Sequence, residues 1–113
     1  MEYNSNSSIR GYHVYKNVWK YEIGDKLICE REENNPNDKF SVKLVLQRGN
    51  PGQCVGHVPI EFSKIFSYFL RRGGNINVTV TGDKFFNIGL EVPCTYTFSG
   101  SNTDIEKLKT LLK

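Results

Sequence analysis

The stretch that decides the fold is Glu30-Arg31-Glu32-Glu33-Asn34-Asn35-Pro36-Asn37-Asp38-Lys39-Phe40, and Val55-Gly56-His57-Val58-Pro59 follows it fifteen residues later. Asn, Pro and Asp are turn formers, so the first segment predicts a strand that ends in a turn. Alternating apolar residues over 40–46 predict a second strand, and the Gly-His pair ends a third strand before a helix. An Asx-rich turn of this kind holds either its own backbone or a ligand.

Similar patterns extend outward from this region. Strands are predicted over residues 10–19, 26–32, 40–46, 53–58, 76–81 and 90–98, with a loop over 82–89. A core-facing helix begins near Pro59 and ends before Gly73, and a last helix opens with a capping-box spacing from Thr103 to Glu106. We therefore predict an α+β, mostly β fold: a small six-stranded antiparallel, barrel-like sheet of OB-like or SH3-like size with two helices.

The chain has 113 residues, a net charge of +3 and three cysteines. This length fits one domain, with residues 1–9 as a disordered N-terminal extension and residues 10–113 as the folded domain. The three cysteines are odd in number and lack the paired spacing of zinc ligands, and the sequence shows no signal peptide and no membrane span. We therefore predict a reducing nuclear or cytoplasmic location and no membrane association. The mild positive charge permits a polyanionic partner without requiring one.

No catalytic or metal-binding set of residues is expected. Cys54 and His57 lie three positions apart on one expected strand, so their side chains point to opposite faces. His13 and His57 have no fixed carboxylate with them and do not make a metal site. The acidic residues between Glu30 and Glu33 are interpreted as a solvated strand end. We therefore expect a binding module without enzyme activity, metal or cofactor.

Two other groups of residues have both a structural and a functional interpretation. Four cations can form a basic rim, although an Arg pair at a helix end also stabilises the helix dipole: Lys64, Arg71, Arg72 and Lys84. Phe85 and Phe86 lie in the expected 82–89 loop, where a ring is either exposed for stacking or folded onto the core.

The order and spacing of these segments resemble the HIRAN domain. The similarity is carried by Gly11-Tyr12-His13-Val14-Tyr15, residues 27–32, Asn34-Asn35-Pro36-Asn37-Asp38, Ser41-Val42-Lys43-Leu44, Val55-Gly56-His57-Val58-Pro59 and residues 93–100. The resemblance implies a six-stranded barrel-like body with two helices, found alone or attached to Swi/Snf-type DNA translocases and helicases. It also implies a pocket for the 3′ end of single-stranded DNA, in which rings stack on bases and a carboxylate accepts the free hydroxyl.

Matched position by position, the resemblance implies roles for five residues of this chain. Asp38 corresponds to the hydroxyl-binding carboxylate, and Asn35 corresponds to the polar residue before it. His57 corresponds to the phosphate contact, and His13 stands where the family has a basic residue. Tyr15 keeps one of the two aromatic positions of the expected first strand.

Three positions depart from the family pattern. Val14 and Asn37 stand where the DNA-end binder has tyrosines, and Leu90 stands where it has a phenylalanine. Base–aromatic stacking contributes ~1 to 3 kcal/mol per base, so these losses weaken the expected binding unless Phe85 or Phe86 replaces them.

The predicted function is a non-enzymatic, monomeric module that binds single-stranded DNA, at its 3′ end, in DNA repair or remodelling machinery. The alternative is a protein-interaction or scaffolding domain that keeps this fold and has lost DNA-end binding, because Val14 and Leu90 make the groove more apolar.

Overall fold

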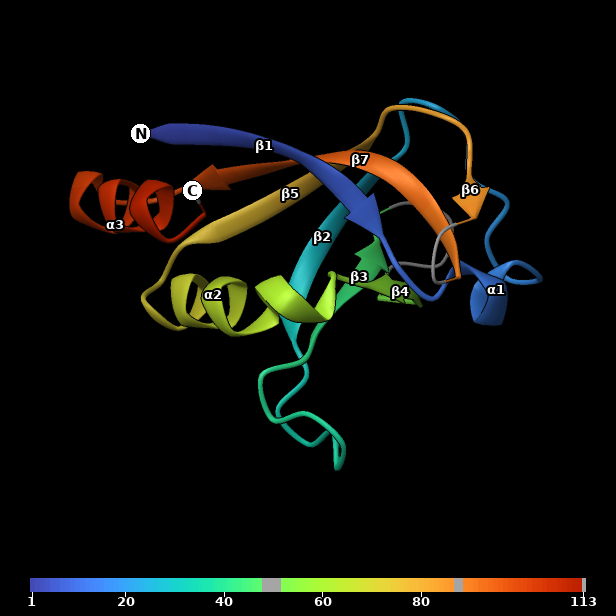
Figure 1. Ribbon diagram of the computed structural model, residues 1–113, viewed down its shortest axis with the longest axis horizontal. Helices are drawn as coiled ribbons and strands as arrows, with labels where there is room; N and C mark the ends of the chain where they lie inside the picture. Colours follow the sequence, from blue (N-terminus) through green and yellow to red (C-terminus); the bar gives the residue numbers. More distant parts are fainter. Residues whose placement is uncertain (48–51, 87–88, 113) are drawn as a thin grey trace.

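The strands form one curled sheet in which every neighbouring pair is antiparallel (Figure 1). The computed structural model describes residues 1–47, 52–86 and 89–112. In chain order its elements are β1 (Glu2–Ile9), α1 (Tyr12–Tyr15), β2 (Lys26–Arg31), β3 (Val42–Leu46), β4 (Cys54–His57), α2 (Ile60–Arg71), β5 (Asn75–Val80), β6 (Phe85–Phe86), β7 (Leu90–Ser99) and α3 (Asn102–Leu112). The strand order is β1-β7-β5-β2-β3-β4, and β6 pairs with the start of β7. The expected mostly β, α+β class is confirmed.

The core lies between the sheet and α2, where aromatic rings from the helix meet rings from β7. Phe66 packs edge-on against Tyr96 and Phe98, with ring centroids 5.0 and 4.9 Å apart. Phe69 meets Phe98 at 5.4 Å. The predicted helix stop is also confirmed, since Gly73 follows the end of α2 with a φ of +92°. The apolar stripe seen in the sequence is therefore the face that α2 presents to the core.

The first and last strands of the sheet order meet at a bridge between Arg10 and His57. The N–H of each residue donates to the carbonyl oxygen of the other at 2.9 Å. A Cβ atom at Gly56 would lie 2.5 Å from Ile9 Cγ2 and 2.9 Å from the Arg10 carbonyl oxygen. Only glycine therefore allows β4 to approach the end of β1 this closely.

The N-terminal segment differs from the sequence prediction. The sequence predicts a disordered extension over residues 1–9, but Glu2–Ile9 form β1, which pairs with β7 from Ser99 to Val92. Exposure alternates along most of the strand, and only Ser8 and Ile9 are buried. The strand is polar because much of one face meets solvent, so it lacks the apolar alternation that marks a strand in sequence.

The region after β1 also differs from the prediction. The sequence predicts a strand over residues 10–19, but Gly11, at φ +83°, precedes the short helix α1. Tyr12 is buried and meets the rings of Trp19 and Tyr21 at 5.9 and 5.2 Å, so ring packing overrides the strand propensity of these aromatics. Phe85 and Phe86, expected in a loop, form β6. The described residues thus contain seven strands and three helices, one more of each than predicted.

The C-terminal helix begins earlier than the sequence predicts. The capping-box spacing suggested a start at Thr103, but α3 begins at Asn102. Ser101 Oγ accepts the main-chain N–H of Asp104 at 3.1 Å, so the capping side chain is Ser101.

Candidate functional site

The turn after β2 holds its own backbone through two side chains. Asn35 Oδ1 accepts the main-chain N–H groups of Asn37 at 2.8 Å and of Asp38 at 3.2 Å. Asp38 Oδ1 in turn accepts the N–H of Phe40 at 2.9 Å. These are Asx-turn hydrogen bonds. Asn35 and one oxygen of Asp38 therefore hold the backbone of the turn and are not free for a ligand. Asn37 is exposed.

The second carboxylate oxygen of Asp38 is not bound to the main chain of the turn. Its contact is with Ser63 Oγ, from α2, at 3.3 Å. The Ser63 hydroxyl has one hydrogen, and its shorter contact is with the carbonyl oxygen of Ile60 at 3.0 Å. Asp38 Oδ2 therefore keeps lone pairs available for an additional hydrogen-bond donor.

This oxygen belongs to the wall of an open hollow between the turn, the end of β4 and the start of α2. We name it the Asp38 hollow; its volume is about 230 Å³, and it is lined by Asn35, Asp38, Ser41, Val42, His57, Val58, Ile60 and Ser63. One water occupies about 30 Å³ in the liquid, so the hollow admits a group of several heavy atoms. The sequence predicts three of these residues as DNA contacts: Asn35, Asp38 and His57. They thus lie around one concavity.

Glu32 holds three of the residues that line the hollow, so its interpretation as a solvated residue is wrong. Its Oε1 accepts hydrogen bonds from Asn35 Nδ2 and Ser41 Oγ at 2.9 Å each, and from His57 Nε2 at 3.0 Å. Burial raises the pKa of Glu32, but the three hydrogen bonds and the charge of His57 outweigh it, and the pKa is lowered overall. Because an ionised carboxylate only accepts, Nε2 of His57 carries a hydrogen.

Replacing Glu32 with glutamine is expected to reduce the dependence of the free energy of unfolding on pH in the acidic range. The folded state lowers the pKa of Glu32, so its carboxylate stabilises the fold above the unfolded pKa. That contribution disappears as the pH falls from the unfolded value, roughly 4.3, through the lower folded value. Urea unfolding of wild type and Glu32→Gln across this range measures the difference. Glu33→Gln, at an exposed neighbour, is the control, and equal pH slopes in all three proteins would contradict the hydrogen-bond set.

His57 also lies beside the aromatic ring that α1 contributes. The ring centroids of Tyr15 and His57 are 6.3 Å apart. A hydrogen bond with the Cys54 thiol, together with burial, raises the pKa of Tyr15 to about 12. Tyr15 therefore lies beside both β4 side chains, and His57 is bound to Glu32 as well.

His13 and Leu90 line a different hollow from Asp38. This second hollow has a volume of about 190 Å³ and is lined by Arg10, Gly11, His13, Gly89, Leu90 and Glu91. Arg10 connects the two sites, since its backbone pairs with His57 and the residue itself lines the second hollow. Val14 is 64% exposed on α1. The residues matched to one family pocket are thus separated: Asn35, Asp38 and His57 line the Asp38 hollow, His13 and Leu90 line the second hollow, and Val14, Tyr15 and Asn37 are not among the residues that line either one.

The four cations expected to form a basic rim are not gathered around one hollow. Lys64 Nζ lies 5.5 Å from the ring of Phe40, at the end of the turn. Arg71 and Arg72 lie at the other end of α2, where Arg72 pairs with an aspartate of α3 at 3.3 Å. Lys84 Nζ lies 5.9 Å from an aromatic ring of α1. Only Lys64 is therefore placed near the Asp38 hollow.

Two residues of the site were missed in the sequence. Ser63 carries a weak signal, because it is a polar residue three positions before Phe66 on the buried side of the helix. Arg10 donates to both carboxylate oxygens of Glu61, at 2.7 and 2.8 Å, and its Nε lies 3.6 Å from Glu91. Nothing in the sequence indicates that Arg10 and Glu61 are partners, since the fold alone brings them together.

Within the described ranges, the structure contains no group of three or more His, Cys, Asp or Glu side chains that could hold a metal ion. No helix in those ranges is both long enough and apolar enough to cross a membrane.

Comparison with known proteins gives one family match and two related structures. The model of the HIRAN domain matches residues 3–94. The HIRAN domain of human HLTF has a TM-score of 0.73 and 22% identity, over 93% of this chain and 82% of that chain. A protein from Lactobacillus plantarum has a TM-score of 0.58 and 11% identity, over 86% of this chain and 98% of that chain. At these identities the structures show the fold alone. A search of curated proteins found no match.

Proposed function

Because the chain belongs to the HIRAN domain family, we propose that it binds single-stranded DNA by its 3′ end, without enzyme activity. The family assignment itself supports the coarser statement, a DNA-binding module. The finer proposal adds the single strand, the free 3′-hydroxyl and a place in nuclear DNA repair or remodelling machinery. It rests on the chemistry available in the Asp38 hollow.

The observation that carries the proposal is that Asp38 Oδ2 keeps lone pairs available beside its 3.3 Å contact with Ser63 Oγ. In the proposed complex the 3′-hydroxyl donates to Oδ2, while Oδ1 continues to hold the N–H of Phe40. An internal nucleotide has no free 3′-hydroxyl and cannot donate this hydrogen bond. A 3′-phosphate would also place a negative charge against the carboxylate. The hollow would therefore distinguish a strand end from the rest of the strand.

Neighbouring phosphates would be held by His57 and Lys64. Nε2 of His57 donates to Glu32, so a hydrogen bond from Nδ1 to a phosphate oxygen requires the imidazolium form, in which both ring nitrogens donate. Lys64 follows Ser63 on α2 and lies near the end of the turn, so its ammonium adds a positive charge beside the hollow. These contacts would position the strand without reading its sequence.

Phe86 is proposed as a ring that stacks on a base. It is 77% exposed, and it pairs across the ladder with Leu90, which lines the second hollow. Because cross-strand partners share a face of the sheet, the Phe86 ring lies beside Leu90. Phe86→Ala is expected to weaken binding of single-stranded DNA about tenfold, within the ~1 to 3 kcal/mol of one stacked base.

Fluorescence anisotropy measures this effect, and Phe85→Ala is the matched control. Adjacent strand residues point to opposite faces, so Phe85 does not share the face of Leu90. Equal losses in the two variants would contradict the stacking role of Phe86.

The proposal is tested by titrating the protein with labelled oligothymidylates that differ only at the 3′ end. A free 3′-hydroxyl is expected to bind at least about tenfold more tightly than a 3′-phosphate, the effect of one charged hydrogen bond. Repeating the titration at several salt concentrations counts the phosphate contacts from the slope. Equal affinity for the two strands would remove the end-binding proposal and leave general DNA binding.

Exposed apolar side chains favour a protein-interaction domain as the second candidate. Val14 is 64% exposed and Ile60 is 71% exposed, and Leu90 contributes an apolar wall to the second hollow. A peptide would then occupy the positions where the family resemblance expects aromatic rings. Absence of saturable binding to either strand at low salt would favour this candidate.

A further inference from the structure

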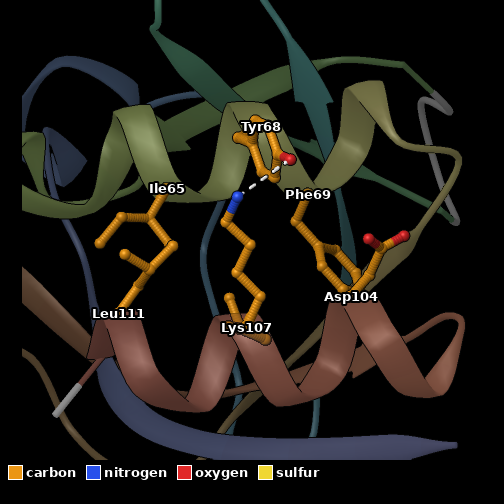
Figure 2. A pocket seen from close by; sticks show the side chains of 7 residues that line it. Ile65, Tyr68, Phe69, Asp104, Lys107 and Leu111 are labelled. Atoms are coloured by element: carbon orange, nitrogen blue, oxygen red, sulfur yellow. Dashed lines mark hydrogen bonds between the residues drawn. The ribbon is translucent and has the colours of Figure 1, made fainter.

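A groove between α2 and α3 forms a separate surface feature. We name it the α2–α3 groove; its volume is about 350 Å³, and it is lined by Lys64, Ile65, Tyr68, Lys107 and Leu111. Figure 2 shows Ile65 and Leu111 facing each other from the two helices, and Lys107 reaching from α3 to Tyr68. Tyr68 and Leu111 are 39% and 45% exposed. An apolar surface between two helices is thus open to solvent.

The groove lies on another side of α2 from the Asp38 hollow. Ser63 lines the hollow and Ile65 lines the groove. Residues two positions apart in a helix are separated by about 200° around its axis, so these side chains point in nearly opposite directions. The two sites thus lie on different sides of α2, and the residue they share is Lys64, which lines the groove and lies near Phe40 at the end of the turn.

Two cations flank the groove, and neither has an acidic partner. Among the ion pairs of the described residues, none includes Lys64 or Lys107. Lys107 Nζ donates to the hydroxyl of Tyr68 at 3.2 Å. The carboxylates of these helices are all paired with other cations: Glu61 with Arg10, Asp104 with Arg72, and Glu106 with Lys109. The groove therefore presents uncompensated positive charge beside its apolar walls.

From this combination we propose that the α2–α3 groove docks an acidic peptide segment of a partner protein. Apolar side chains of the peptide enter between Ile65 and Leu111, and its carboxylates pair with Lys64 and Lys107. An amphipathic helix has this distribution of groups, with apolar residues at i, i+4 and i+7 and acidic residues beside them. Of the residues proposed for DNA end-binding, the groove includes Lys64.

The groove suits a peptide better than a nucleic acid because a lysine already lies over one face of its aromatic ring and its other walls are aliphatic. Lys107 Nζ lies 4.6 Å from the centroid of the Tyr68 ring, over one of its two faces. The remaining walls, Ile65 and Leu111, are aliphatic and offer no hydrogen bonds to a base or a phosphate. Apolar anchors gain from burial here, whereas a phosphate backbone would meet only the two lysines.

The test uses a fluorescein-labelled synthetic helix with leucines at i, i+4 and i+7, glutamates beside them and alanines at its other positions. Saturable binding is expected in anisotropy titrations at low salt, with amide shift changes in nitrogen-15 NMR spectra confined to α2 and α3. Lys107→Glu is expected to weaken binding roughly five- to tenfold, because an attraction becomes a repulsion. Leu111→Ser is expected to weaken it about tenfold through lost apolar burial.

Lys20→Glu is the matched control, because it makes the same charge change at an exposed lysine outside both helices. It is expected to change the affinity less than about twofold. Equal weakening by Lys107→Glu and Lys20→Glu would overturn the proposal. Equal binding of a peptide with lysines in place of the glutamates would overturn it as well. Displacement of the peptide by oligothymidylate from α2 and α3 would assign the groove to nucleic acid instead.

Discussion

Gly56→Ala is expected to lower the free energy of unfolding by about 2–3 kcal/mol, the upper part of the range for overpacking. The added Cβ would lie 2.5 Å from Ile9 Cγ2 and 2.9 Å from the main-chain oxygen of Arg10. A side-chain atom can move aside, but the Arg10 oxygen is fixed by its hydrogen bond to His57. Relief of the overlap therefore requires the end of β4 to move away from the end of β1, which breaks the bridge.

Thermal and urea unfolding measure this effect, and the expected fall in Tm is on the order of 10 °C for a domain of this size. Gly82→Ala is the matched control, because a Cβ there would meet Pro93 Cγ at 3.4 Å and Pro93 Cβ at 3.6 Å, which are ordinary contacts. Its stability should change by less than about 0.5 kcal/mol. Similar stability losses in the two variants would show that Gly56 is not required for closure of the sheet.

Asp38→Asn is expected to weaken binding to a strand with a free 3′-hydroxyl by about 10- to 100-fold, the contribution of a hydrogen bond to a charged group. The amide keeps an oxygen for the N–H of Phe40, so the turn is preserved. The change removes the charged acceptor at Oδ2 and places a donor there instead. Binding of a 3′-phosphate strand should stay the same or improve, because the carboxylate no longer repels it.

The specificity of this effect is checked with a variant of equal charge. Asp83 is exposed in the segment between β5 and β6, so Asp83→Asn makes the same change in net charge away from the hollow. It should leave the preference for the 3′-hydroxyl intact. A comparable loss of preference in Asp83→Asn would mean that net charge, and not the Asp38 oxygen, controls binding.

The elements that the sequence predicts correctly are those whose periodicity is set by one apolar face. The stripe that includes Phe66 and Phe69 predicts α2, and the Gly73 stop lies where it was expected. β1 has no such stripe, since Glu2, Asn4 and Asn6 are exposed and the residues between them are only half-buried. Its position is set by pairing with β7, near the other end of the chain, so a local sequence pattern does not predict it.

The composition of the candidate site was less predictable than the fold. The turn chemistry of Asn35 and Asp38 is local, and it can be read from the sequence. The contact of Glu32 with His57 depends on the register of β2 against β3 and of β3 against β4. Lys43 lies opposite Glu30 on one side and His57 on the other, which brings the ends of these strands together. Such a partnership follows from sheet register, which the sequence does not specify.

The most direct test of the proposed end recognition is a cycle of four dissociation constants. Wild type and Asp38→Asn are each titrated with an oligothymidylate that ends in a free 3′-hydroxyl and with the same strand bearing a 3′-phosphate. We expect a coupling of at least about 1.5 kcal/mol, with the hydroxyl preference present in wild type and absent in the variant. Equal preference in the two proteins, or no preference in wild type, would contradict the assignment of Asp38 Oδ2 as the acceptor of the 3′-hydroxyl.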